Sequence, residues 1–160
     1  MRVVKEIMYS TPAYCGKTES LRNAIMTMSM SNIGSLPVVD INRKVVGILT
    51  NRDICVILGK TNKTPAEIKV QEAMTTDAYT CAPDDDTKDA LKIMRLKKVH
   101  RLPVVDALGH LQGLLSLNAI VHQYEKNKES EEVEYNGEEN VVKTLRSIAD
   151  KRYEHPANWE

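Results

Sequence analysis

The chain has 160 residues, of which 42% are apolar and 28% charged, and its formal net charge is zero. The balanced charge argues against a nucleic-acid partner held mainly by bulk electrostatics, and no apolar run approaches the roughly 20 residues of a membrane-spanning helix. The N-terminus lacks the apolar stretch of a signal peptide, and the three cysteines have no metal-ligand spacing. We therefore expect a soluble, cytoplasmic protein with reduced thiols.

An internal repeat organises the chain. The pentapeptide Leu-Pro-Val-Val-Asp occurs at residues 36–40 and again at 102–106, an offset of 66 residues. The same offset pairs many residues outside the pentapeptide, such as Val4 with Val70. One copy of a repeat is usually a supersecondary unit that cannot bury its apolar face alone, so we expect two half-domains that share one core.

In chain order, each copy opens with an apolar lead-in and a short extended piece, at 12–15 in the first copy and at 78–81 in the second. Thr18 and its counterpart Asp84 then stand where the N-cap of a helix belongs. The apolar residues that follow recur with the period of an amphipathic helix. The predicted buried face consists of Leu21, Ala24, Ile25 and Met28 in the first copy, and of Ala90, Leu91, Met94 and the further candidate Ile93 in the second.

Two β-rich segments joined by a polar turn follow in each copy and predict a hairpin. Proline cannot donate a hydrogen bond to a ladder, so the first strand should start or end its pairing at Pro37. A second helix then completes the order strand, helix, strand, strand, helix. The hairpins are predicted at 36–40 with 45–50 and at 102–106 with 111–116, and the second helices at 51–58 and 117–124.

Beyond residue 124 the repeat is lost. A charged and polar stretch is typical of a solvated linker, and Val141, Val142, Leu145 and Ile148 then recur at helical spacing. We expect a short amphipathic helix here that packs on its own domain or on a second subunit. The predicted segments are a first repeat at 4–58, a linker at 59–67, a second repeat at 68–124, a charged linker at 125–140, a C-terminal helix at 141–152 and a tail at 153–160.

Several blocks of sequence carry a resemblance to a known family. The first copy has Met8, the pentapeptide and Gly-Ile-Leu-Thr-Asn-Arg-Asp-Ile at 47–54. The second copy has Met-Thr at 74–75, His-Arg before its pentapeptide and Gly-Leu-Leu-Ser at 113–116. Each copy resembles a cystathionine-β-synthase (CBS) domain, and the chain resembles the small bacterial stand-alone proteins that consist of one CBS pair.

The resemblance implies an α/β (α+β) fold in which two pseudo-symmetric CBS repeats pack through their sheets, an arrangement called a Bateman module. In such pairs the clefts between the copies bind AMP, ADP, ATP or S-adenosylmethionine. Two modules commonly associate into a flat homodimer. Ligand occupancy usually changes the geometry of another protein, so an unknown regulated protein is an expected partner.

The resemblance also implies which residues hold the ribose. In the family, a Thr or Ser and an Asp three residues later bind its hydroxyls, and the first copy has both as Thr50 and Asp53. The second copy has Ser116 but Ala119 at the Asp position. The alternative interpretation of Thr50 and Asp53 is a helix N-cap with an acidic residue in the first turn. The two roles are compatible.

In the family, the phosphate contacts of this cleft come from the other copy, just before its Leu-Pro-Val strand. These positions are His100 and Arg101, whose side chains suit phosphate oxygens, whereas the opposite cleft would draw on Gly34 and Ser35 and gain no charge. The alternative for His100 and Arg101 is a solvated turn. Asn118 is expected to reach the phosphates where some relatives carry Lys. By position in the family pattern, the adenine should contact Ile48, Ala78, Tyr79, Val99 and Pro103.

The sequence thus predicts a non-catalytic regulatory module with one well-equipped and one degenerate site. An adenine nucleotide is its expected regulatory ligand, and no cofactor is required. One alternative is a dimeric interaction or scaffold module that binds no nucleotide, and another is a module that binds S-adenosylmethionine. An enzyme is a third alternative, although no nucleophile and base can be paired. No metal, nucleic-acid or membrane role is expected. The acidic run Asp84-Asp85-Asp86 favours helix capping over catalysis.

Overall fold

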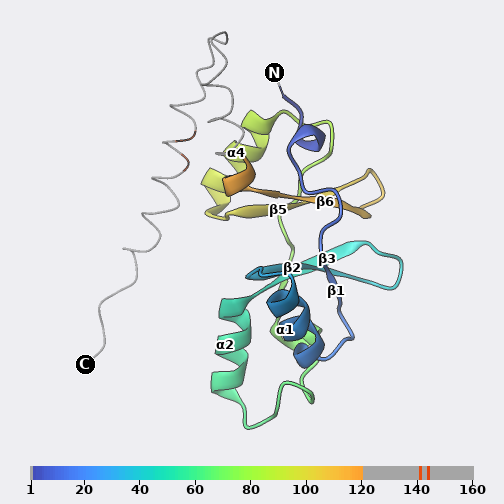
Figure 1. The fold of residues 1–160 in the computed structure, drawn as a ribbon, viewed down its shortest axis with the longest axis vertical. Coiled ribbons are helices and arrows are strands. Elements are labelled where there is room, and N and C mark those ends of the chain that lie inside the picture. Colours follow the sequence, from blue (N-terminus) through green and yellow to red (C-terminus); the bar gives the residue numbers. More distant parts are fainter. Residues whose placement is uncertain (1, 121–140, 142–143, 145–160) are drawn as a thin grey trace, which may run out of the picture.

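The computed structural model of the protein describes residues 2–120 together with residues 141 and 144. Within that part of the chain, two copies of a mixed α/β unit lie one above the other (Figure 1). In chain order the elements are η1 (Val4–Glu6), β1 (Cys15–Gly16), α1 (Leu21–Met30), β2 (Ser35–Val39), β3 (Val45–Thr50), α2 (Asn51–Lys60), α3 (Val70–Ala73), β4 (Thr75–Thr76), α4 (Thr87–Lys97), β5 (Arg101–Val105) and β6 (Leu111–Ser116).

Two β-sheets form the middle of the molecule. The first has the order β1-β2-β3-β4, in which β1 is parallel to β2 and the other pairs are antiparallel. The second consists of β5 and β6, and single bridges place Cys81 beside Val104 and Tyr9 beside Leu114. At the offset of 66 residues these bridges repeat the pairings of β1 with β2 and of β4 with β3, so both sheets have the same plan.

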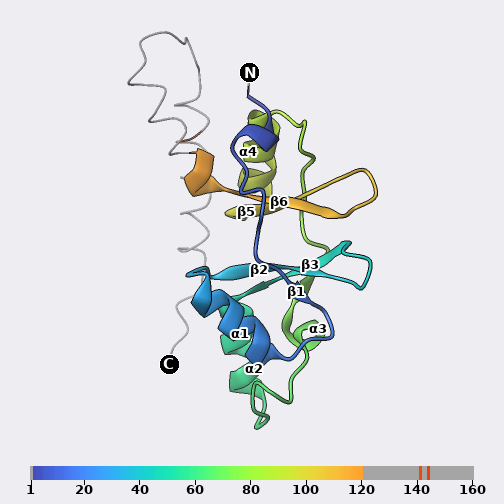
Figure 2. The ribbon, with the colours of Figure 1, turned by 45° about the vertical axis from the view of Figure 1, so that its right-hand side comes forward.

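The two sheets face each other, and helices cover their outer faces (Figures 1 and 2). Helices α1 and α2 lie on the far side of the first sheet, and α4 lies on the far side of the second. Leu49 of β3 and Leu102 of β5 are fully buried in the apolar clusters beneath these helices. The predicted packing of two repeats through their sheets is therefore confirmed.

Both predicted hairpins form, but the expectation for the proline is only half right. Pro37 lies inside the ladder of β2 with β3, opposite Ile48, so pairing with β3 does not stop there. Pairing of β2 with β1 does begin just after the proline, at Val38. A proline is tolerated in a strand where the ladder on one side has not yet begun, because its missing N–H then costs no hydrogen bond.

The predicted helix starts at Thr18 and Asp84 are wrong by two residues. The N-caps are Ser20, which accepts from the Asn23 amide, and Asp86, which accepts from the Lys88 amide. The residue before each cap closes a tight turn instead. The Glu19 carboxylate accepts from the Gly16 amide at 2.9 Å, and the Asp85 carboxylate accepts from the Ala82 amide at 2.7 Å. That turn must be completed before the helix can begin. The predicted inner faces of both helices are confirmed, with Ile25 and Ile93 only partly buried.

Among the described residues, the apolar interior consists of two clusters rather than the one shared core that we expected. Each cluster is completed by a segment from the other copy. Val4 belongs to the cluster around Leu102, while Ile68 and Val70 belong to the cluster around Leu36. Backbone hydrogen bonds hold each segment on the opposite copy. The Val4 amide donates to the Asp85 carbonyl (2.9 Å), and the Val70 amide donates to the Glu19 carbonyl (2.9 Å). The lead-in of each sequence repeat therefore packs on the opposite repeat.

The hairpin tips of the two copies also touch. The Val45 amide donates to the Gly109 carbonyl at 3.0 Å, and the Leu111 amide donates to the Arg43 carbonyl at 3.2 Å. These bonds join the sheets at one end of the molecule. The open ends of both hairpins, where Thr50 and Arg101 lie, are consequently at the other end.

The described part of the chain ends in a helical turn at 117–120, where the second helix of the second copy was predicted. The predicted linker at 125–140 and the tail at 153–160 lie outside the described residues. So does the predicted C-terminal helix, except for Val141 and Thr144, which are helical and buried. Among the described helices, none combines the length and apolarity that crossing a membrane requires.

Candidate functional site

Thr50 and Asp53 form a capping box at the junction of β3 and α2. The Asp53 Oδ2 atom accepts from the Thr50 amide (2.8 Å) and from the Thr50 hydroxyl (2.7 Å), while the Thr50 hydroxyl oxygen accepts from the Asp53 amide (3.3 Å). The capping role weighed for this pair is therefore real. The box uses Oδ2 alone, so it fixes the carboxylate in place without engaging its Oδ1 atom.

The equivalent junction in the second copy has the cap but lacks the carboxylate. The Ser116 hydroxyl oxygen accepts from the Ala119 amide at 3.1 Å. Because Ala119 has no polar side chain, the reciprocal half of the box is missing there. The two repeats thus share a backbone geometry and differ in one acidic group.

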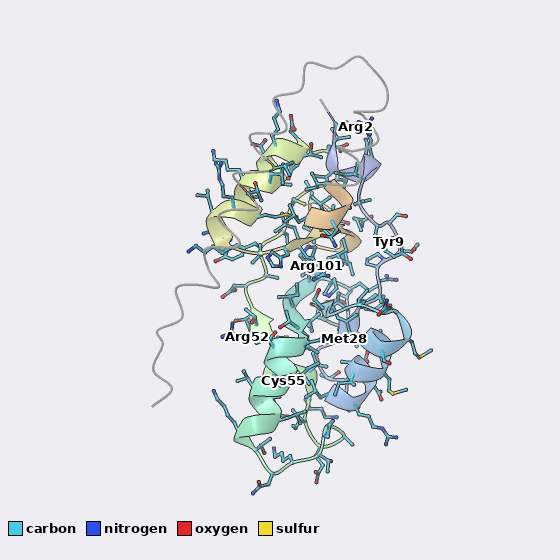
Figure 3. The ribbon with its side chains drawn as sticks, turned by 60° about the vertical axis from the view of Figure 1, so that its left-hand side comes forward. Arg2, Tyr9, Met28, Arg52, Cys55 and Arg101 are labelled. Atoms are coloured by element: carbon cyan, nitrogen blue, oxygen red, sulfur yellow. The ribbon has the colours of Figure 1, made fainter. Side chains whose placement is uncertain are left out.

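Four of the predicted site residues point into the space between the sheets. Ile48 and Thr50 alternate along β3 with the buried Leu49, and Arg101 and Pro103 alternate along β5 in the same way. Successive side chains of a strand point to opposite faces, so these residues lie on the face turned toward the other sheet. Figure 3 shows Arg101 at the level where the two sheets adjoin.

The remaining phosphate and adenine candidates of the second copy surround the start of β5. The His100 carbonyl accepts from the Leu117 amide at 2.9 Å, so the β5 start is tied to the turn that carries the exposed Asn118. Val99 is partly buried against the second apolar cluster. These residues are neighbours within their own copy.

Ala78 and Tyr79 lie on the segment that runs from β4 in the first sheet to Cys81 at the second. Tyr79 is 45% exposed, and the Lys97 ammonium lies 4.8 Å from its ring centre, within the range of a cation–π contact. Lys97 was not predicted, because nothing in the sequence links it to Tyr79.

Ala78 also lines a hollow of about 290 Å³ beside the hairpin tips. It is the one predicted site residue among the described residues that line this hollow. The other lining residues were not predicted, because they come from β3, β5, the segment after β4 and the turn at Gly109, which meet only in the folded chain. They are Val45, Val46, Asp77, Thr80, Val105 and Gly109.

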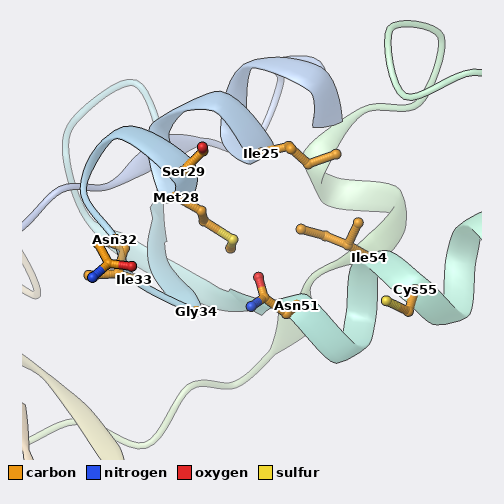
Figure 4. A pocket seen from close by; sticks show the side chains of 9 residues that line it. All are labelled: Ile25, Met28, Ser29, Asn32, Ile33, Gly34, Asn51, Ile54 and Cys55. Carbon is orange, nitrogen blue, oxygen red and sulfur yellow. The ribbon is translucent and has the colours of Figure 1, made fainter.

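A larger hollow, of about 650 Å³, lies between α1 and α2 on the outer side of the first sheet (Figure 4). None of the ten predicted site residues lines it. Its lining residues are Ile25, Met28, Ser29, Asn32, Ile33, Gly34, Asn51, Ile54 and Cys55.

The two buried cysteines give no sign of nucleophilic chemistry. Burial raises the pKa of the Cys15 and Cys81 thiols to about 12, so both remain protonated at neutral pH, and only thiolates react as nucleophiles. Cys55 is exposed on α2. Within the described part of the chain, no group of three or more His, Cys, Asp or Glu side chains is placed to hold a metal ion.

Known proteins contain units similar to the two repeats. A family model described as "CBS domain" matches residues 4–60 and 70–126. An inosine-5'-monophosphate dehydrogenase of Methanocaldococcus jannaschii is 34% identical over 119 residues, which are 74% of this chain but 22% of that enzyme. The chain thus spans about a fifth of the length of the dehydrogenase. A 17.7 kDa protein of Acidianus ambivalens is 32% identical over 124 residues, 74% of each chain.

Solved structures show the same arrangement. The CBS domain pair of protein MJ0100, in complex with 5'-methylthioadenosine and S-adenosyl-L-methionine, superimposes with a TM-score of 0.69 at 28% identity. The match covers 77% of this chain and 99% of that one.

Proposed function

The chain belongs to the CBS domain family, and on that basis we propose that it is a regulatory module that binds an adenosine-containing ligand, foremost AMP, ADP or ATP, between its two repeats. The proposed contacts are Thr50 and Asp53 for the ribose, His100, Arg101 and Asn118 for the phosphates, and Ile48, Ala78, Tyr79, Val99 and Pro103 for the adenine.

The observation that carries this proposal is the Thr50–Asp53 junction. The capping box holds the carboxylate rigidly through Oδ2, which leaves Oδ1 to accept from ribose hydroxyls. A preorganised charged acceptor loses little entropy when a ligand binds. The second copy has Ala119 at this place, so the second cleft has no such acceptor.

The charge on the opposite sheet supports a phosphate-bearing ligand. Arg101 lies on the inner face of β5, and its planar guanidinium suits two phosphate oxygens at once. The ligands of the MJ0100 pair, 5'-methylthioadenosine and S-adenosyl-L-methionine, share the adenosine group and carry no phosphate. A nucleotide and S-adenosylmethionine would therefore use the same ribose anchor and differ at Arg101.

Calorimetry with AMP, ADP, ATP and S-adenosylmethionine tests the proposal on the ligand-free protein. Asp53→Ala should raise the Kd of the tightest ligand about 10- to 100-fold, because a hydrogen bond to a charged group contributes about 1.5–3 kcal/mol. Arg101→Gln should weaken the nucleotides and spare S-adenosylmethionine.

Ser116→Ala is the matched control, since it removes the equivalent cap in the other copy and should leave the affinity unchanged. Thermal unfolding of each variant separates a lost ligand contact from a lost cap. Absence of binding heat for all four ligands, with a folded protein, would refute the proposal.

The proposal includes no catalysis, and it includes a homodimer. Met26 and Met30 of α1 and Val56 of α2 are exposed in the single chain. Methionine is enriched at subunit interfaces, and exposed apolar surface often marks an interaction site. Sedimentation analysis tests the dimer, and a monomer at all accessible concentrations would remove this part of the proposal.

A further inference from the structure

The hollow beside the hairpin tips lies at the end of the molecule away from Thr50 and Arg101. The turns of both hairpins project to the same side there (Figures 1 and 2). The hollow has a volume of about 290 Å³, slightly below the roughly 300 Å³ at which pockets for small-molecule ligands begin. Its size suits one side chain better than a whole nucleotide.

At the pseudo-symmetric position, two side chains of the chain itself meet across the equivalent space. The offset of 66 residues relates Gly109 and Thr80, which line the hollow, to Arg43 and Tyr14. The Arg43 guanidinium carbon lies 5.0 Å from the centre of the Tyr14 ring, which is a cation–π contact. The hollow is thus the place where the other repeat puts an arginine and an aromatic ring.

The two positions also differ in the acidic group. Asp77 lines the hollow, whereas its counterpart in the position with Arg43 is the uncharged Thr11. No described residue forms an ion pair or a hydrogen bond with the Asp77 carboxylate. One position therefore has a guanidinium without a carboxylate, and the hollow has a carboxylate without a guanidinium.

Exposed apolar side chains lie in the turns beside the hollow. Leu108, which directly precedes Gly109, is 67% exposed, and Ile41 in the turn of the first hairpin is 97% exposed. The hydrogen bonds between the tips hold the two turns together. Exposed apolar surface next to a hollow is typical of an interaction site.

We propose that the hollow binds an arginine side chain from an exposed segment of another protein. The guanidinium pairs with the Asp77 carboxylate, for which its planar fork of donors is suited. The apolar stem of the arginine packs against Val46 and Val105, which line the hollow. Apolar neighbours of the arginine contact Leu108 and Ile41. This docking site goes beyond the proposed nucleotide site and needs no nucleotide.

Three probes test the proposal on the full-length, nucleotide-free chain. The first is an acetylated and amidated Gly-Leu-Arg-Leu-Gly peptide, the second has citrulline, a neutral isostere, in place of arginine, and the third is free arginine. Amide NMR spectra show where each probe binds. The arginine peptide should shift the signals of Val46, Ala78 and Gly109. The citrulline peptide should bind about fivefold more weakly, because it cannot pair with an exposed carboxylate.

Gly109→Arg supplies the arginine from the chain itself. The φ of Gly109 is 86° and that of Arg43 is 63°, so arginine already occupies a left-handed backbone at the equivalent place. A Cβ atom added at Gly109 has nothing within 4 Å. The variant should fold and should bind the arginine peptide at least about tenfold more weakly.

Gly109→Asn is the matched control. Asparagine also tolerates a left-handed backbone, and its side chain is too short to fill the hollow. Binding of the arginine peptide should persist in this variant, while Gly109→Arg should lose it.

Asp77→Asn removes the charge and keeps the size of the side chain. The φ of Asp77 is 55°, which asparagine also accepts. The variant should weaken the arginine peptide about fivefold, to the affinity of the citrulline peptide. High salt should reduce the difference between the two peptides in the wild type, because the pair is exposed to solvent.

Four results would overturn the proposal. Equal affinity of the arginine and citrulline peptides would mean that no guanidinium is recognised. Binding that survives Gly109→Arg would place the peptide elsewhere. Free arginine that binds as tightly as the peptide would assign the hollow to a small guanidine ligand. Signals of the hollow that shift with protein concentration alone would assign it to a second copy of the chain.

Discussion

Asp53 is a helix-capping residue by observation and a ligand contact by proposal. Both roles follow from one geometry, since the bonds to Thr50 orient the carboxylate at the end of β3, on the side of the molecule away from the hairpin contact. A capping residue at such a place contributes to stability whether or not a ligand is present. A loss of binding in an Asp53 variant can therefore be assigned to the ligand contact only if the stability of the same variant is also measured.

Ala119→Asp should stabilise the second repeat. The Ser116 hydroxyl already accepts from the amide of residue 119, and a carboxylate there would complete the capping box. We expect a gain of about 0.5–1 kcal/mol, seen as an increase in Tm of a few degrees. An unchanged or lower Tm would show that the surroundings of Ser116 exclude the carboxylate.

The buried thiols should make the protein less stable in alkali. Burial raises the pKa of the Cys15 and Cys81 thiols to about 12 in the folded chain, against a usual value of 9.0. The unfolded chain loses these protons first, so the stabilisation is complete below pH 9 and falls between pH 9 and 12. Denaturant titrations across that range should show a smaller loss of unfolding free energy for Cys15→Ala than for the wild type.

At the scale of elements, the contact between β3 and β4 depends on Gly47. A Cβ atom at this position would lie 2.5 Å from the Thr75 carbonyl oxygen, and one at the counterpart Gly113 would lie 2.5 Å from the Met8 sulfur and 3.0 Å from the Tyr9 carbonyl oxygen. Both glycines thus allow the segment from the other copy to approach the strand. A backbone atom cannot move aside as the end of a flexible side chain can, so Gly47 is the stricter of the two.

Gly47→Ala should lower the free energy of unfolding by about 1–3 kcal/mol, the usual cost of overpacking a buried site. The Tm should fall and the pairing of β3 with β4 should loosen. Gly59→Ala in α2 is the matched control, because nothing lies within 4 Å of its added Cβ. Alanine is a better helix former than glycine by up to about 1 kcal/mol, so this control should be neutral or stabilising. Equal destabilisation by both changes would contradict the prediction.

At the scale of the whole molecule, the exchanged lead-ins make the two repeats one folding unit. Each repeat taken by sequence lacks a piece of its own cluster, which the other repeat supplies through Val4 on one side and through Ile68 and Val70 on the other. The hairpin tips add a second link. A ligand between the sheets would therefore act on a single cooperative body.

Val4→Ala tests whether the lead-in of the first repeat packs on the second repeat. The fully buried side chain loses two carbons, which should cost about 1–3 kcal/mol, and hydrogen exchange should quicken in α4 and β5 rather than in α1 and β2. Ile41→Ala, at a side chain that is 97% exposed, should change the stability by less than about 0.5 kcal/mol. Faster exchange confined to α1 would mean that Val4 packs on its own repeat.

The sequence by itself determined the elements and the family. Periodicities of two and 3.6 residues and a constant offset are local properties of the chain, so hairpins, helix faces and the doubled unit could be read directly. The asymmetry between Asp53 and Ala119 could also be read, because it needs only the offset. The helix starts were missed because the turns closed by Glu19 and Asp85 compete with capping by nearby side chains.

Only the tertiary structure decided which segments complete which cluster. The lead-in of each repeat crosses to the other because its hydrogen-bond partners lie there, and such contacts join residues about eighty or fifty positions apart, as Val4 with Asp85 and Val70 with Glu19. Burial depends on what packs against a surface, and that is a property of the folded chain.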